Sequence, residues 1–308
     1  MTTRRHHASA LAMLVLTAGL AGCGGGSASK LKASDDIIRS ASANTAVLPN
    51  DSSEAAMTAL SAAQAVVEAG PFGQTINCPV SGTAKYAVTG GNLASLTNGV
   101  FDAGENYIVD FSACQGAGGT ATVNGHMTLT IKSASAGSVT ADSVSTNLSV
   151  VLPQRTVTLN GSSTLTQTVT STGVSSTTKT QRWTAQRMNV NSERKGRNNL
   201  FVFDNLNIGR TISEVNGVPV SSKGESNSTL DANLAFFTWQ ITLATLGLVT
   251  YGPTGVVTDG QWIVGLPDDR IALKISQDAV ELSVDFGNDG TVDAFFLFRL
   301  DTFVDEAG

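Results

Sequence analysis

The alternation of apolar and polar side chains from about residue 75 onward restricts the fold of this sequence more than any other feature. Tyr107, Val109 and Phe111 alternate with Ile108, Asp110 and Ser112. Residues 143–190 alternate Val or Leu with Ser or Thr. A period of two places alternate side chains on opposite faces of a strand. Gly, Ser, Thr, Asn and Val are abundant, which also favours strands and turns. The sequence therefore predicts a mainly β fold with antiparallel strands.

Asn–Gly pairs interrupt this alternation without changing its phase. Apolar positions keep their phase through Asn124-Gly125, and they do so again through Asn160-Gly161. The first set is Val123, Met127, Leu129 and Ile131. An inward glycine allows a strand to bend or bulge, so we expect the strands to continue through these pairs. The sheet that they form should be antiparallel and strongly curved, either a half-barrel or sandwich-like. Val-Asn-Gly and Leu-Asn-Gly form a weak internal repeat, whereas Asn216-Gly217 fits a hairpin turn equally well.

One helix is expected ahead of the sheet. Asp51-Ser52-Ser53-Glu54 is typical of a helix start, because a side-chain oxygen there can accept a hydrogen bond from free backbone amides. Apolar residues follow at helical spacing until Gly70-Pro71, at Met57, Leu60, Ala63 and Val67. The prediction is a helix over 53–69, packed on the sheet, at the start of a single domain spanning 51–308.

The second half of the chain continues the β pattern. Residues 192–199 indicate a polar hairpin tip, solvated rather than anion-binding, with Arg194, Lys195 and Arg197. Leu234 to Tyr251 is the most apolar stretch beyond the N-terminus, and we interpret it as core strand, with a buried helix as the alternative. A meander of four strands closes the chain, over 261–265, 270–276, 279–286 and 292–300.

The N-terminus has the three parts of a secretory signal. Arg4-Arg5 precede an apolar core from Ala8 to Ala21, which is shorter than the roughly 20 residues that span a bilayer. The core ends in Leu20-Ala21-Gly22-Cys23, which resembles the lipobox of bacterial lipoproteins. That resemblance implies a signal peptide over 1–22, lipidation of Cys23 and a membrane partner bound through the lipid anchor. An ordinary cleaved signal is the alternative.

Residues 23–50 are rich in Gly, Ser, Ala and Asp without a clear period, so we expect a flexible tether there. In lipoproteins, Asp after the lipidated cysteine commonly means retention in the inner membrane. Gly24 stands at that position here, so the family resemblance implies the outer membrane. Beyond the lipobox, the chain resembles β-rich lipoproteins of proteobacteria, a resemblance that implies no activity.

Two of the three cysteines remain once Cys23 is assigned to lipid. An even pair in an exported protein indicates a disulfide, so we expect a bond between Cys78 and Cys114. The absence of Cys-x-x-Cys spacing favours a structural bond over a redox site. Two buried free thiols are the alternative.

Few residues are available for catalysis. His126 is the only histidine after the signal, and it shares a strand face with Thr128 and Thr130, where we expect it to point to solvent. Neither a nucleophile elbow nor a phosphate loop occurs in the sequence, and no cofactor is expected. Asp268 and Asp269 follow a proline in a turn, where acidic residues are ordinary.

One turn deserves comparison with calcium loops. Asp285, Asp289 and Asp293 surround a glycine, as in Asp-rich calcium-binding turns, but the EF-hand alternation and its final glutamate are missing. An Asn-Asp-Gly turn between two strands accounts for the same residues. Calcium is therefore a weak candidate, and we expect no metal.

Charge and chemistry together favour a non-catalytic function. Removing Arg4 and Arg5 with the signal takes the formal net charge from −6 to −8, which argues against nucleic acid and anionic lipid headgroups as partners. We therefore expect a cell-envelope lipoprotein with a binding, carrier or structural role, whose partner is an apolar ligand or an envelope protein. A carboxylate-dependent hydrolase and a surface-display or adhesin module are the alternatives.

Overall fold

The computed structural model describes residues 33–69, 75–92, 98–115, 121–152, 155–194, 197–234, 237–252 and 256–305. The chain divides into two units, Met1–Lys30 and Leu31–Gly308, and all described residues belong to the second. The predicted signal peptide, the lipobox and Cys23 lie outside the described residues.

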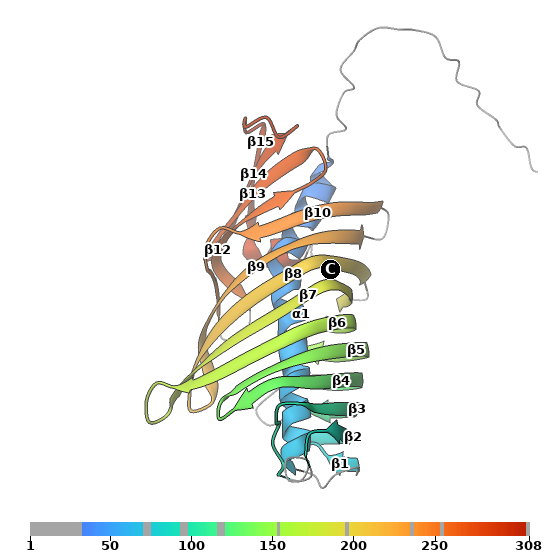
Figure 1. Cartoon of the computed structure of the whole chain (residues 1–308). Coiled ribbons are helices and arrows are strands. Elements are labelled where there is room, and N and C mark those ends of the chain that lie inside the picture. Colours follow the sequence, from blue (N-terminus) through green and yellow to red (C-terminus); the bar gives the residue numbers. More distant parts are fainter. Residues whose placement is uncertain are drawn as a thin grey trace, which may run out of the picture. The chain divides into compact units, whose positions relative to one another are not determined.

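The fold is mainly β, with one large antiparallel sheet of fifteen strands and helices at both ends of the described chain (Figure 1). The first half comprises α1 (Asp35–Ala69), β1 (Thr75–Asn77), β2 (Ser81–Gly90), β3 (Glu105–Gln115), β4 (Thr122–Ser135), β5 (Ser138–Leu152), β6 (Arg155–Ser171) and β7 (Ser176–Arg194). The second half comprises β8 (Arg197–Val215), β9 (Val218–Leu234), β10 (Phe237–Thr245), β11 (Val249–Tyr251), β12 (Val257–Gly265), β13 (Asp269–Ser276), β14 (Ala279–Phe286), β15 (Ala294–Arg299) and α2 (Leu300–Asp305).

The strands follow one another in sequence order from β1 to β10 and then from β12 to β15, while β11 pairs with β9 and β12. They form a single sheet rather than two stacked ones, and it does not close on itself, because β1 and β15 lie at its two ends. The prediction of a mainly β antiparallel fold with an N-terminal helix is confirmed. The predicted meander near the C-terminus is also confirmed, as β12 to β15.

The predicted tether over 23–50 is wrong from Asp35 onward, because α1 begins there and continues to Ala69. Asp51 to Ser53, expected at the helix start, lie in its middle. Asp35 and Asp36 occupy the true first turn, where acidic side chains stabilise the positive end of the helix dipole. The helix also continues through Pro49, which supplies no amide to bond the carbonyl four residues earlier.

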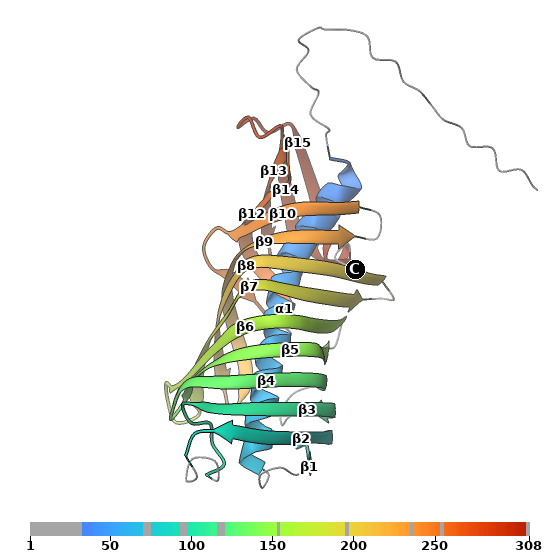
Figure 2. The same cartoon turned by 45° about the vertical axis from the view of Figure 1, so that its right-hand side comes forward.

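Helix α1 crosses the strands along the inner side of the curved sheet (Figures 1 and 2). It contacts β2 to β9, β12, β13 and α2. Every residue from Ala41 to Ser53 is buried, more than three full turns, so this part of the helix is covered on all its faces. Its alanines allow the strands to approach closely, and its apolar side chains join those of the strands in one core.

The inward Asn–Gly pairs lie within continuous strands, as predicted, and each faces a bulge in the preceding strand. The β3–β4 register shifts between Phe111 and Cys114, and Asn124 Oδ1 accepts a hydrogen bond of 2.7 Å from the Ala113 amide. Asn160 Oδ1 accepts a bond of the same length from the Asn147 amide, where the β5–β6 register shifts. Ala113 and Asn147 both adopt positive φ, 48° and 47°. The sequence repeat therefore encodes a repeated bulge, in which asparagine bonds to the extra residue of the preceding strand.

Gly125 is expected to tolerate no side chain. Its φ is 98°, and a Cβ built there would lie 2.1 Å from the carbonyl oxygen of Asn147. Gly125→Ala should therefore lower the free energy of unfolding by about 2–3 kcal/mol, which combines backbone strain with displacement of β5. Gly217→Ala is the matched control, because φ is 75° but nothing lies within 4 Å. Urea denaturation that finds equal losses in the two variants would contradict this account of the bulge.

Asn216-Gly217 forms the hairpin turn between β8 and β9, with Val215 opposite Val218. The apolar stretch from Leu234 to Tyr251 contributes β10 and β11, so the strand interpretation is confirmed over the helical one. Among the described residues, no helix is both long and apolar enough to cross a membrane.

The predicted disulfide is confirmed. Cys78 and Cys114 are bonded, with Cα atoms 5.4 Å apart, and both side chains are buried. Cys78 lies between β1 and β2, while Cys114 lies in β3 directly after the bulge at Ala113. The bond therefore joins the first end of the sheet, where β1 has only three residues, to the longer strands beyond it.

Candidate functional site

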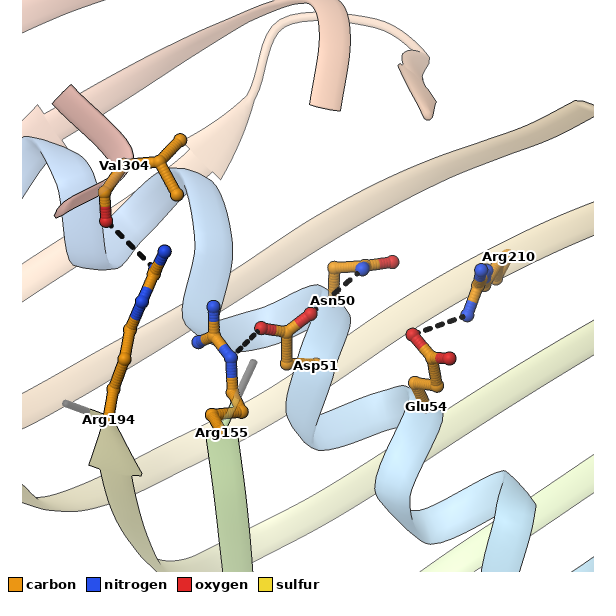
Figure 3. A network of polar contacts seen from close by, with 7 residues as sticks. All are labelled: Asn50, Asp51, Glu54, Arg155, Arg194, Arg210 and Val304. Carbon is orange, nitrogen blue, oxygen red and sulfur yellow. Dashed lines mark hydrogen bonds and ion pairs between the residues drawn. The ribbon is translucent and has the colours of Figure 1, made fainter. Parts of the chain in front are cut away.

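A buried polar network connects the middle of α1 to the sheet (Figure 3). Asp51 on α1 forms an ion pair through Oδ2 with Nε of Arg155, the first residue of β6. Both side chains are almost completely buried, 12% and 5% exposed. The Asn50 side-chain amide donates a 3.2 Å hydrogen bond to Asp51 Oδ1, so both carboxylate oxygens have a partner. Satisfaction of this kind is what a buried charge requires.

A second ion pair lies one turn farther along α1. Glu54 Oε2 is 3.7 Å from Nη1 of Arg210, which comes from β8. Arg210 Nε also donates a 2.8 Å hydrogen bond to the Ser222 hydroxyl on β9. Tyr251 of β11 is buried nearby, and burial raises the pKa of its hydroxyl far above the ordinary value. The network thus extends from α1 over three neighbouring strands.

Arg194 connects the network to the C-terminal helix. This last residue of β7 is 4% exposed, and its Nη1 donates a 2.8 Å hydrogen bond to the carbonyl oxygen of Val304 in α2. The predicted solvated hairpin tip over 192–199 is therefore wrong for Arg194, whose side chain is directed inward toward α2 (Figure 3). Lys195 lies outside the described residues, as does the side chain of Arg197.

Burial dominates the electrostatics of the two carboxylates. Loss of solvation raises the pKa of Asp51 above its ordinary value, while the charges of Arg155, Arg194 and Arg210 act in the opposite direction. Loss of solvation likewise raises the pKa of Glu54, opposed by Arg210. Asp51 is held by a guanidinium group and an amide in the core, so the arrangement acts as a clamp between helix and strands. A carboxylate that attacks a substrate, or a carboxylic acid that protonates one, must instead be reachable by that substrate.

His126 lies on the outer face of β4, as predicted. Its Nδ1 is 2.6 Å from Asp110 Oδ1 on β3, and the two side chains are 38% and 59% exposed. Thr146 of β5 occupies the next position in the same cross-strand row. This flat, exposed row is explained by cross-strand pairing of polar side chains.

Asp269 is buried, contrary to the expectation of an ordinary turn residue. It is 3% exposed, and its carboxylate accepts hydrogen bonds of 3.1 Å from the amides of Ala33 and Gly287. One side chain thereby fixes both a residue just ahead of α1 and the turn after β14. Asp268, next to it, is exposed as expected.

The acidic turn uses its carboxylates to bind backbone amides. Asp285 accepts from the amides of Asp289 and Gly290, both at 2.9 Å, and Asp293 accepts from the Phe286 amide at 2.8 Å. Asp289 accepts from the Thr291 amide at 2.9 Å. These bonds explain all three weak calcium candidates as turn residues. Within the described part of the chain, no three acidic, histidine or cysteine side chains gather as metal ligands would.

Comparison of the chain with protein-family models, with curated proteins and with solved structures finds no match.

Proposed function

We propose that this protein is a lipid-anchored, non-catalytic protein of the cell envelope, held at the outer membrane through Cys23, with a structural or scaffolding role. The lipobox supports the anchor, and the architecture of the second unit supports the role. Its sheet is curved and open, and the chain's own helix lies along the inner side of that sheet. Among the polar groups buried there, Asp51 pairs with Arg155 of β6, and Arg194 of β7 bonds to a carbonyl of α2.

The single observation that carries this proposal is the burial of α1 from Ala41 to Ser53 on every face. In a carrier with a half-barrel architecture, an apolar ligand would bind against the inner face of the sheet. Here α1 contacts that face along most of the sheet. Ligand entry would require the helix to leave, which would separate the buried Asp51–Arg155 pair. A permanently packed helix therefore favours a structural role over a carrier role.

The alternatives of hydrolase and adhesin have weaker support. A hydrolase needs a pair of carboxylates that a substrate can reach, whereas Asp51 and Glu54 are directed at arginines. An adhesin would use the outer face of the long strands, which carries many Ser and Thr side chains. No particular contact on that face, within the described strands, favours a partner of a given chemistry.

The anchor makes a direct prediction. Mass spectrometry of the membrane-extracted protein should show Cys23 as an acylated N-terminus. Cys23→Ser should abolish acylation. Because two or more acyl chains are what anchor such a protein stably, the variant should leave the membrane fraction. Density-gradient fractionation should place the parent protein with outer membranes.

Ser27→Ala is the matched control, because it changes a small residue near the lipobox without touching the cysteine. It should leave both acylation and fractionation unchanged. Recovery of an unacylated chain that still begins at Met1 would reject the anchor, and recovery of the acylated chain with inner membranes would reject outer-membrane residence alone.

A further inference from the structure

The two ends of the sheet differ in a way that points to a partner. At one end lies β1, a strand of three residues, Thr75 to Asn77. The disulfide joins this end to the rest of the sheet. The other end is β15, a six-residue strand with the sequence Ala-Phe-Phe-Leu-Phe-Arg. Among the described strands, β15 pairs with β14 alone. Natural sheets protect such edges with charges, proline, bulges or short strands, and the centre of β15 carries neither a charge nor a proline.

The apolar side chains of β15 lie on both faces of the sheet. Phe296 and Phe298 face inward and stack on each other with ring centroids 6.1 Å apart, and Phe303 of α2 stacks on Phe298. Phe295 and Leu297 face outward and are 59% and 65% exposed. Phe296 and Phe298 are half-buried and pack against the core, which accounts for the apolar inner face of this strand. The outer pair has no such explanation within the described chain.

The backbone of β15 offers hydrogen-bonding groups to a further strand. Leu300 N–H donates to Asp278 O at 2.8 Å, and Phe298 and Phe296 lie opposite Val280 and Leu282. Hydrogen-bonded pairs recur at every second residue of an antiparallel ladder. The backbone groups of Phe296 and Phe298 therefore point toward β14, and those of Phe295 and Leu297 point away from the sheet.

We propose that β15 pairs antiparallel with β15 of a second copy of this chain, about a two-fold axis at Phe296. This register places Phe295 opposite Leu297 of the second copy, so that the exposed apolar side chains cover each other. It also places Arg299 opposite Asp293 of the second copy, once on each side of the axis. Asp293 directly precedes β15, and its Oδ2 accepts a hydrogen bond from the Phe286 amide of its own chain. Arg299 is 82% exposed and now pairs with Asp301 of its own chain, at 3.0 Å.

Neighbouring registers are less favourable. An axis at Leu297 would place Phe295 opposite Arg299 and bring Asp293 opposite Asp301, two like charges. An axis at Phe295 would place Arg299 opposite Thr291, with no charge partner. Only the axis at Phe296 combines apolar pairs at the centre with opposite charges at both ends. Charge complementarity between two copies therefore favours this register of the pairing. The pairing goes beyond the proposed structural role and does not require the lipid anchor.

Disulfide crosslinking tests the register. Phe295→Cys and Leu297→Cys would be introduced separately into the full chain, and the proteins purified from the envelope would be oxidised mildly, alone and as an equal mixture. Opposed residues of a hydrogen-bonded pair lie about 5.5 Å apart between Cα atoms, within reach of a disulfide. The mixture should therefore form linked dimers well in excess of either variant alone. Val144→Cys is the matched control, since Val144 is an outward apolar residue, 45% exposed, on a strand paired on both sides.

Each other outcome has a distinct meaning. Absence of linked dimers in the mixture would overturn the pairing, and stronger linkage by one variant alone would overturn the register. Adding Arg299→Asp to both variants should lower the yield of dimer about tenfold, because the introduced carboxylate would then oppose Asp293 of the second copy. An unchanged yield would also overturn the register. Linkage of the parent protein, without added cysteine, would reveal a free Cys23 and count against the lipid anchor, not against the pairing.

Discussion

Replacement of Arg155 by methionine is expected to lower the free energy of unfolding by about 3–5 kcal/mol at neutral pH, because it leaves the Asp51 carboxylate charged and without its cation in the core. Methionine preserves much of the length and apolar surface of the arginine stem, so the effect reports mainly the lost charge. The measurement is urea denaturation followed by circular dichroism. Arg187→Met is the matched control, since Arg187 forms an exposed ion pair with Asp204 at 3.1 Å, and its loss should cost less than about 1 kcal/mol.

The loss in the Arg155→Met variant should diminish as the pH falls. Burial already raises the pKa of Asp51 above its ordinary value of 3.8, and removal of Arg155 raises it further. A carboxyl whose pKa is higher in the folded state than in the unfolded state favours folding when protonated. Its contribution is fully present below the unfolded pKa and is lost as the pH rises through the folded pKa. The variant should therefore approach the parent in acid and diverge from it toward neutral pH.

A second substitution separates the charge from the packing. Asp51→Leu combined with Arg155→Met removes both charges, and the double variant should recover most of the stability that the single variant loses. A double variant that is less stable than Arg155→Met alone would contradict the view that an uncompensated charge causes the loss. It would assign the effect to packing instead.

Removal of the disulfide is expected to have an effect of similar size. Cys78 and Cys114 enclose a loop of 36 residues, and the loop entropy of the unfolded chain predicts a loss of about 3.5–4 kcal/mol in the Cys78→Ala, Cys114→Ala double variant. Because the bond joins the connection between β1 and β2 to β3, the loss should begin at this end of the sheet. Hydrogen exchange should show faster exchange in residues 75–90 than in β6 to β8.

Reduction of the parent protein serves as a second measurement of the same bond. Dithiothreitol should lower the melting temperature of the parent to that of the double variant and leave the variant itself unchanged. Uniform loss of protection over the whole sheet would show that the bond stabilises the domain globally rather than at its first end.

Much of the sheet could be predicted from local pattern. The alternation around Tyr107 and the unbroken alternation through Asn124-Gly125 depend on neighbouring residues. The disulfide followed from the even pair of cysteines, Cys78 and Cys114, left in an exported protein. These signals indicated the strands, the bulges and the disulfide. The hydroxyl-rich alternation over 143–190 likewise predicted long strands, and the structure has them as β5, β6 and β7.

The helix boundary and the buried network could not be predicted in the same way. The segment 35–50 contains Ser, Asn and Asp, which are typical of loops, and Asp51-Ser52-Ser53-Glu54 indicated a helix start after it. One feature of the sequence favoured a longer helix: no glycine occurs between Gly26 and Gly70, and ten alanines of this stretch lie in α1. Burial of Asp51 depends on Arg155, more than a hundred residues away, and no local pattern reports such a distance.

The repeated bulge gives this architecture a natural unit of growth. Two adjacent strands widen a sheet by about 10 Å, which a helix crossing them spans with six or seven residues. Helix α1, with 35 residues, is about 52 Å long. Duplication of one hairpin with its Asn–Gly pair would preserve the curvature, provided that the helix lengthens by about two turns. The lengths of sheet and helix are thus coupled, and an insertion in one without the other would leave either bare helix or an open stretch of sheet.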